Sequence, residues 1–110
     1  MMDSPQLLIA HTTCADATAA ERLARGLVEA HLAACVSIGS EVRSLYPWQG
    51  RIETSQEVPV LIKTTPESLP ALKEFFVEHH DYDVPELLVT PVIDGHPPYL
   101  QWAREWLSHD

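Results

Sequence analysis

Basic residues are scarce in this chain of 110 residues. Seven Lys and Arg residues stand against 16 Asp and Glu residues, which gives a formal charge of −9 at pH 7. Nucleic-acid affinity depends on Lys and Arg side chains that displace counterions from phosphates, so we expect no nucleic-acid partner. The acidity is concentrated after Gln56, in a half that also holds four of the six histidines. Such a half either attracts cations or simply keeps the protein in solution.

Long apolar runs are also lacking. No stretch approaches the roughly 18 to 20 apolar residues that a membrane span needs. Residues 1–5 have neither the charged start nor the apolar core of a signal peptide. We therefore expect a cytoplasmic protein with no membrane partner.

Cysteine and glycine are rare, with two and four residues respectively. Cys14 and Cys35 flank a predicted helix about 27 Å long at ~1.5 Å per residue, whereas a disulfide needs Cα atoms within ~7 Å, so we predict no disulfide. The scattered glycines form no phosphate-binding loop, and no Gly-x-Ser-x-Gly elbow occurs. The chain therefore carries no catalytic signature, and we predict that it is not an enzyme.

The apolar pattern predicts a single α+β domain over residues 1–110. Apolar runs or alternation mark strands, and apolar residues at helical spacing mark helices. The predicted elements are strand 6–13, helix 16–33, a hairpin of strands 36–48 and 52–64, a helix from residue 65 to residue 80, strand 86–93 and a helix from residue 97. The last helix offers Tyr99, Leu100, Ala103, Trp106 and Leu107 for burial.

This β-α-β-β-α-β order with an added C-terminal helix is the ferredoxin-like pattern. In its sheet order, 4-1-3-2, the last strand lies at an edge, which accommodates Pro91 because proline cannot donate a ladder hydrogen bond. Pro59 falls in the central third strand. We therefore predict a bulge or interrupted pairing at Pro59.

The hairpin is too long for one small domain. Two arms that meet at Gln49-Gly50 would each span ~43 Å at ~3.3 Å per residue, while a domain of this size has a radius of gyration of only ~13 Å. Part of the hairpin must project or bend sharply. A projecting ribbon tipped by Tyr46 and Trp48 needs another subunit to cover it.

Two places carry candidate metal ligands. Cys14 precedes a helix, whose N-terminus would lower the pKa of the thiol; the residue is either a ligand or merely oxidisable. His79-His80 lies beside Asp81, Asp83 and Glu86, a set that suits copper, zinc or nickel. Both imidazoles can face one ion only if the helix has ended by His80. Alternatively, they cap the helix as cations and need no metal. Elsewhere, Lys63 and Glu57 on one strand could form a partly buried ion pair.

Several segments resemble the CutA family of divalent-cation tolerance proteins. They are residues 16–35, Ser44-Leu45-Tyr46 with Trp48 and Gly50, residues 57–65, residues 80–92, and Tyr99-Leu100 with Trp102. Their order and spacing cover residues 7–107. The resemblance implies a ferredoxin-like subunit, a homotrimer whose long hairpins wrap neighbouring subunits, and a role linked to copper or other divalent cations without catalysis.

The resemblance also implies two candidate sites. In bacterial relatives copper ligation is attributed to a cysteine that ends the first strand and to histidines that match His79 and His80. When the two sequences are matched backwards from Cys35, the residue at the position of that cysteine is Thr12. Side chains two residues apart in a strand point to the same face, so Cys14 shares the face of Thr12 if the strand continues to residue 14. The second site is a cleft between subunits that Trp48, Glu57, Lys63, His80, Tyr82 and Glu86 could line.

Two functions follow as hypotheses. The first is a homotrimer that binds copper or another divalent metal ion through His79, His80 and Cys14 and has no organic cofactor. The alternative is a signalling or interaction trimer that binds a small metabolite or a protein partner at the inter-subunit cleft, by analogy with other ferredoxin-like trimers.

Overall fold

The computed structural model describes residues 5–108 and contains five strands and three helices over that range. The elements are β1 (Leu7–Cys14), α1 (Ala17–Glu29), β2 (Cys35–Ile38), β3 (Val42–Trp48), β4 (Arg51–Thr64), α2 (Leu69–His79), β5 (Leu88–Val92) and α3 (Pro97–Leu107). Among the described residues, no helix is long and apolar enough to cross a membrane.

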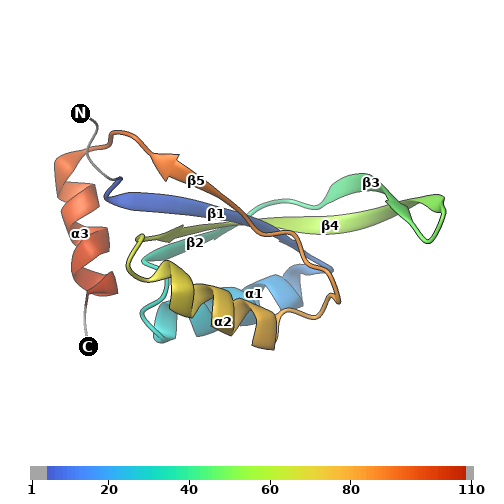
Figure 1. The fold of residues 1–110 in the computed structure, drawn as a ribbon, viewed down its shortest axis with the longest axis horizontal. Helices are drawn as coiled ribbons and strands as arrows, with labels where there is room; N and C mark the ends of the chain where they lie inside the picture. Colours follow the sequence, from blue (N-terminus) through green and yellow to red (C-terminus); the bar gives the residue numbers. More distant parts are fainter. Residues whose placement is uncertain (1–4, 109–110) are drawn as a thin grey trace.

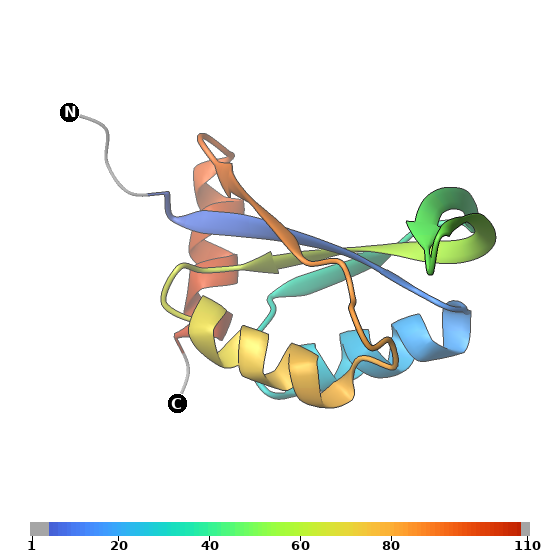
Figure 2. The ribbon, with the colours of Figure 1, turned by 45° about the vertical axis from the view of Figure 1, so that its right-hand side comes forward.

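The strands form an antiparallel sheet in the order β2-β4-β1-β5, with β3 continuing the hairpin beyond it. Helices α1 and α2 lie side by side under one face of the sheet, and α3 stands across one end (Figure 1, Figure 2). The main core lies between the two helices and the sheet, where Ala10, Leu27, Val60, Ile62 and Leu72 are fully buried. This arrangement confirms the ferredoxin-like prediction, including the edge position of Pro91.

The helix ends differ from the sequence predictions. Helix α1 ends at Glu29, before the predicted residue 33, because His31 takes a left-handed backbone conformation with φ 58°. Helix α2 begins only at Leu69, after a turn in which the Ser68 amide donates to Thr65.

Gly26 is needed where α1 meets α2, since a Cβ there would lie 2.7 Å from the Phe75 ring.

The two arms of the hairpin differ. Strand β4 runs without a break over 14 residues, whereas the opposite arm is interrupted at residues 39–41 between β2 and β3. Pro59 lies opposite this interruption, and its carbonyl accepts from the Gly39 amide at 2.9 Å. The amide and carbonyl of one residue in an antiparallel strand point the same way, so the missing N–H of Pro59 faces the interruption. The predicted break in pairing is confirmed.

The hairpin projects from the domain as an extended arm (Figure 1). Gln49 and Gly50, both with positive φ, form its turn, and the molecule has a radius of gyration of 14.9 Å against about 13 Å for a compact chain of this length. Cross-strand register places Leu45 and Ile52 on one face and Tyr46 and Trp48 on the other. On the first face Leu45 is 65% and Ile52 71% exposed, and on the second Tyr46 is 38% and Trp48 45% exposed. Neither face is therefore covered within the chain.

Helix α3 buries a second, smaller core at the end of the sheet. Ala103 and Leu107 pack against Leu7 and Ala34. Tyr99 and Trp106, which the apolar pattern also offers for burial, remain 41% and 38% exposed within the chain. Trp106 lies at the rim of α3, where its indole N–H donates to the Val28 carbonyl and its ring stacks on His31.

Candidate metal site at the end of β1

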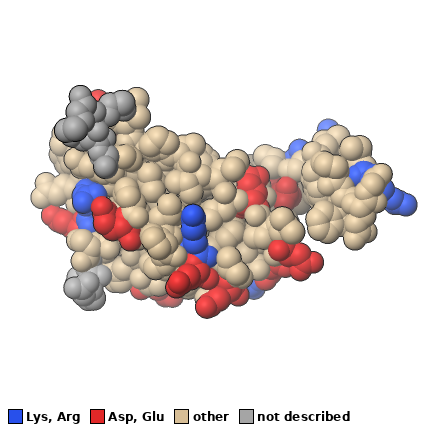
Figure 3. Space-filling model, viewed as in Figure 1, with Lys and Arg blue, Asp and Glu red and all other residues tan. Residues whose placement is uncertain are grey.

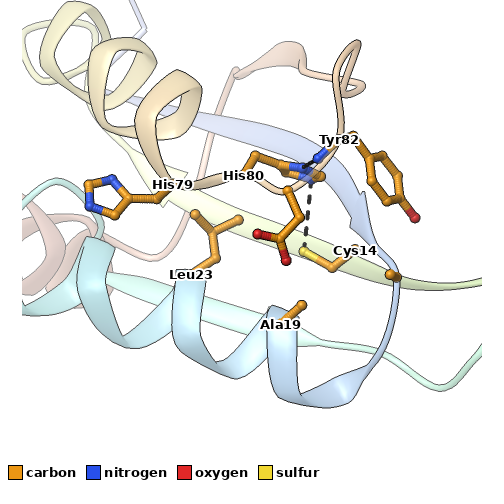
Figure 4. Close-up of a pocket in the computed structure, with 8 residues that line it drawn as sticks. Cys14, Ala19, Leu23, His79, His80 and Tyr82 are labelled. Carbon is orange, nitrogen blue, oxygen red and sulfur yellow. Dashed lines mark hydrogen bonds between the residues drawn. The ribbon is translucent and has the colours of Figure 1, made fainter.

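Cys14 and His80 meet at one end of the core. Strand β1 continues to Cys14, so Thr12 and Cys14 share the buried face, 2% and 3% exposed. Helix α2 ends at His79, and His80 is already extended, with ψ 138°. This turn brings His80 Nε2 to 4.0 Å from Cys14 Sγ (Figure 4). The thiol near the histidine therefore belongs to Cys14, and the match of Thr12 to the family cysteine stays a prediction.

His79 lines the same small pocket, but its imidazole points away from the other two side chains (Figure 4). The ring stacks on Phe75 at a centroid distance of 3.9 Å, and its Nδ1 lies 2.8 Å from the Phe75 carbonyl. Within residues 5–108, no group of three or more His, Cys, Asp or Glu side chains is placed to hold a metal ion. The structure therefore joins His80 to Cys14 but does not bring His79 to them.

Both ring nitrogens of His80 are hydrogen-bonded. Nδ1 lies 3.1 Å from the amide of Tyr82, which can only donate, so Nδ1 accepts and carries no proton. Nε2 lies 2.8 Å from the Thr13 carbonyl, which can only accept. The hydrogen bonds therefore assign the neutral tautomer with its proton on Nε2.

The expectation that the helix terminus favours the Cys14 thiolate is wrong. Burial, followed by the negative charges of Asp81 and Asp16, raises the pKa of the thiol to about 11. Asp16 is the N-cap of α1, so the residue that starts the helix also places a carboxylate near the thiol. Cys14 is protonated at neutral pH, and a metal ion that bound it would displace the thiol proton.

The raised pKa of Cys14 makes stability depend on pH. The folded chain keeps the thiol proton above the ordinary thiol pKa of 9.0, where the unfolded chain loses it. This stabilisation is complete below pH 9.0 and is lost as pH rises through about 11. We expect the free energy of unfolding to fall between pH 8 and 10 by about 1 kcal/mol more in the wild type than in Cys14→Ala, as measured by urea denaturation. Parallel pH profiles for the two chains would contradict this expectation.

Glu57 is a buried carboxylate beside this pair. It is 8% exposed, and its Oε2 accepts from Thr13 Oγ1 and Tyr82 Oη, each at 2.9 Å. Burial alone would raise the pKa of Glu57, but hydrogen bonds from Ser44, Tyr82 and Thr13 outweigh it and hold the pKa below the ordinary 4.5. The carboxylate thus joins β1, β3, β4 and the segment after α2. Sequence reasoning placed neither Thr13 nor Ser44 at this site, because no local pattern shows that both reach Glu57.

The remaining cleft candidates lie apart in one chain. Trp48 is at the hairpin tip, and Glu86 is exposed on the segment before β5. Lys63 is near the other end of β4, where its Nζ lies 3.3 Å from Ser37 Oγ and 4.0 Å from Cys35 Sγ. The predicted Lys63–Glu57 ion pair is therefore wrong. Both cysteines are free, as predicted.

The fold and this site define a class: a small ferredoxin-like protein with a projecting hairpin and a cysteine–histidine pair at the end of its first strand. The model of the CutA1 divalent ion tolerance protein family matches residues 8–106. The chain belongs to this family.

Individual relatives agree with this assignment. The chain is 42% identical over 102 residues to a CutA homolog of Xenopus laevis, covering 93% of this chain and 68% of the relative. It is 45% identical over 92 residues to a divalent-cation tolerance protein CutA of Pectobacterium atrosepticum, covering 84% of each. The crystal structure of a CutA1 from a psychrotrophic Shewanella superposes with a TM-score of 0.92 at 45% identity, covering 97% of this chain and 100% of that one. The chain spans only 54% of the mouse and human relatives it matches.

Proposed function

We propose that the protein is a non-catalytic homotrimer that binds copper or a similar thiophilic metal ion through Cys14 and His80. The observation that carries this proposal is the 4.0 Å separation of Cys14 Sγ and His80 Nε2. Metal–sulfur and metal–imidazole bonds are about 2.3 Å and about 2.0 Å long, so a separation near 4.0 Å is one that a single ion bound to both atoms can span. A thiol with an imidazole is also the donor set that copper and zinc prefer.

The surface charge supports cation attraction toward this end of the core. Acidic side chains gather along the side formed by α1 and α2, while basic ones mark the hairpin (Figure 3). Asp81, next to His80, is an exposed member of this acidic side and pairs with Arg22 at 2.9 Å. A field of one sign raises the local concentration of counter-ions near a site.

The exposed apolar surface supports self-association. The hairpin is uncovered on both faces, and the sheet face opposite α1 and α2 leaves Leu61 39% and Leu88 62% exposed. Burying apolar surface is worth ~25 cal/mol per Å², so copies of the chain gain by covering each other's hairpins. A threefold assembly is what resemblance to the CutA family implies.

A direct test is titration of the native assembly with Zn²⁺, and with Cu⁺ under anaerobic conditions, followed by calorimetry. We expect saturation at one ion per chain and release of a proton for each ion bound, since the Cys14 thiol is protonated beforehand. Binding should tighten as pH rises toward the thiol pKa. Absence of saturable binding of either ion would overturn the proposal.

A second candidate rests on Lys63. Its ammonium contacts Ser37 and Cys35, and among the described residues it has no carboxylate partner. An unpaired cation on a strongly acidic chain favours an acidic small molecule or protein partner, held in a cleft between subunits that Trp48, Glu57, Tyr82 and Glu86 would help to line. The test adds small carboxylate ligands and follows Trp fluorescence in the wild type and in Lys63→Gln. A change in the wild type only, together with no binding of Zn²⁺ or Cu⁺, would favour this candidate.

The cytoplasmic location stays a prediction. A rice relative, 36% identical over 97 residues, is named chloroplastic, so membership of the family does not by itself indicate the cytoplasm.

A further inference from the structure

Tyr82 contacts His80 through both its backbone and its ring. Its amide donates to His80 Nδ1 at 3.1 Å, and the two rings meet edge to face at a centroid distance of 4.8 Å. The His80 ring also contacts the Phe76 ring, at a centroid distance of 4.9 Å. The imidazole therefore contacts two aromatic rings, one of them the Tyr82 ring seen in Figure 4, and its Nδ1 accepts from a backbone donor.

This arrangement conflicts with metal ligation. A neutral imidazole that offers its Nε2 lone pair to a metal ion carries its proton on Nδ1 and donates it to an acceptor. In this structure Nδ1 faces the N–H of Tyr82, which is itself a donor. His80 Nε2 already faces Cys14, but it can offer a metal ion an unprotonated Nε2 only after the Tyr82 amide has moved away from Nδ1. A flip of the ring would remove the clash but would also carry Nε2 away from the sulfur.

The side chain of Tyr82 opposes that movement. Its hydroxyl donates to Glu57 at 2.9 Å, and Glu57 is fixed in turn by Thr13 at 2.9 Å and by Ser44. The Tyr82 backbone cannot move away from His80 without stretching a hydrogen bond to a buried carboxylate. Such charge-assisted bonds are about twice as strong as neutral ones.

We propose that Tyr82 is a latch that holds His80 in the tautomer unable to bind metal, with Glu57 as its anchor, so that opening of the metal site is coupled to the base of the hairpin. This inference rests on the proposed function of Cys14 and His80. Ser44 and Glu57 stand where β3 and β4 leave the sheet. Displacement of Tyr82 therefore weakens the hydrogen bonds of Glu57 at the base of the hairpin, where the projecting arm begins.

The latch predicts the direction of a mutational effect. Tyr82→Phe keeps the ring and the amide but removes the bond to Glu57, so the amide moves away more easily and metal binds more tightly. One net hydrogen bond corresponds to an affinity gain of about fivefold. A residue that merely positions His80 for binding would give the opposite sign, since loosening it would weaken binding.

The test measures Zn²⁺ affinity for the wild type, Tyr82→Phe and Tyr99→Phe by competition with a chelator. Tyr99→Phe is the matched control, because it loses a phenol hydroxyl close to Cys35 and away from this pocket. We expect about fivefold tighter binding in Tyr82→Phe only, and a smaller gain in Glu57→Gln, whose neutral amide is a weaker acceptor. Unchanged or weaker binding in Tyr82→Phe would overturn the latch.

A second measurement separates the latch from the proposed function. Nitrogen-15 NMR of the metal-free chain should show that Nε2 of His80 carries a proton and that Nδ1 is unprotonated. A proton on Nδ1 would overturn the latch even if metal binds. Conversely, a His80→Ala chain that bound Zn²⁺ as well as the wild type would refute the proposed site while leaving the tautomer result intact.

Discussion

The variant Leu45→Glu/Ile52→Glu is expected to be a folded monomer of 12.3 kDa, whereas the wild type is expected to be a trimer. The two side chains lie on one face of the hairpin, 65% and 71% exposed in the isolated chain. Each loses about 1.5–3 kcal/mol of burial when it becomes charged, and a trimer loses this for every copy. Light scattering at micromolar concentration measures the mass, and circular dichroism confirms that the chain is folded.

The control for this variant is Val77→Glu on α2. Val77 is 76% exposed, yet it lies on a helix rather than on the projecting arm. It adds one negative charge, against two in the hairpin variant, to an already acidic chain. Because this charge lies away from the hairpin, the mass of the assembly should not change. A trimeric Leu45→Glu/Ile52→Glu chain, or a monomeric Val77→Glu chain, would refute the assignment of the hairpin as the association surface.

The second large effect is expected at the proposed metal site. His80→Ala and Cys14→Ala should each weaken Zn²⁺ and Cu⁺ binding by more than about a hundredfold, since loss of an outer partner of a ligand already costs 10–100-fold. His79→Ala is the matched control on the adjacent residue. Its imidazole contacts Phe75 and points away from Cys14, so its removal should leave affinity within about twofold of the wild type.

These three variants distinguish a site made by Cys14 and His80, as the structure of the single chain suggests, from a site that also includes His79, as the sequence suggests. Equal losses in His79→Ala and His80→Ala would mean that both imidazoles ligate, which would require the α2 terminus to rearrange. A loss in His79→Ala alone would move the site to another surface and contradict the role given to Cys14.

Much of the fold was predictable because its signals are local. Alternation along residues 52–64 identified β4, and the turn at Gln49-Gly50 fixed the hairpin. Pro59 indicated where pairing breaks. The helix ends were less predictable, because His31 takes a left-handed conformation that glycine usually adopts, and the first turn after Thr65 is not α-helical.

The site was only partly predictable because it depends on contacts between distant segments. Strand alternation correctly placed Cys14 on the face of Thr12. The condition set for both imidazoles to face one ion, a helix that has ended by His80, is met, yet the His79 ring packs on Phe75, which the sequence does not show. The sign of the Cys14 pKa shift could not be read from sequence, since it depends on burial and on the approach of Asp81. The same holds for Glu57, whose partners come from β1, β3 and the segment after α2.

The most direct measurement is X-ray absorption spectroscopy at the metal edge of the protein loaded with one Cu⁺ per chain. Cys14 and His80 predict one sulfur at about 2.2–2.3 Å and one nitrogen at about 2.0 Å from the ion. The sulfur signal should vanish in Cys14→Ala. A wild-type spectrum with nitrogen or oxygen neighbours only, and no sulfur, would contradict the assignment of the end of β1 as the metal site.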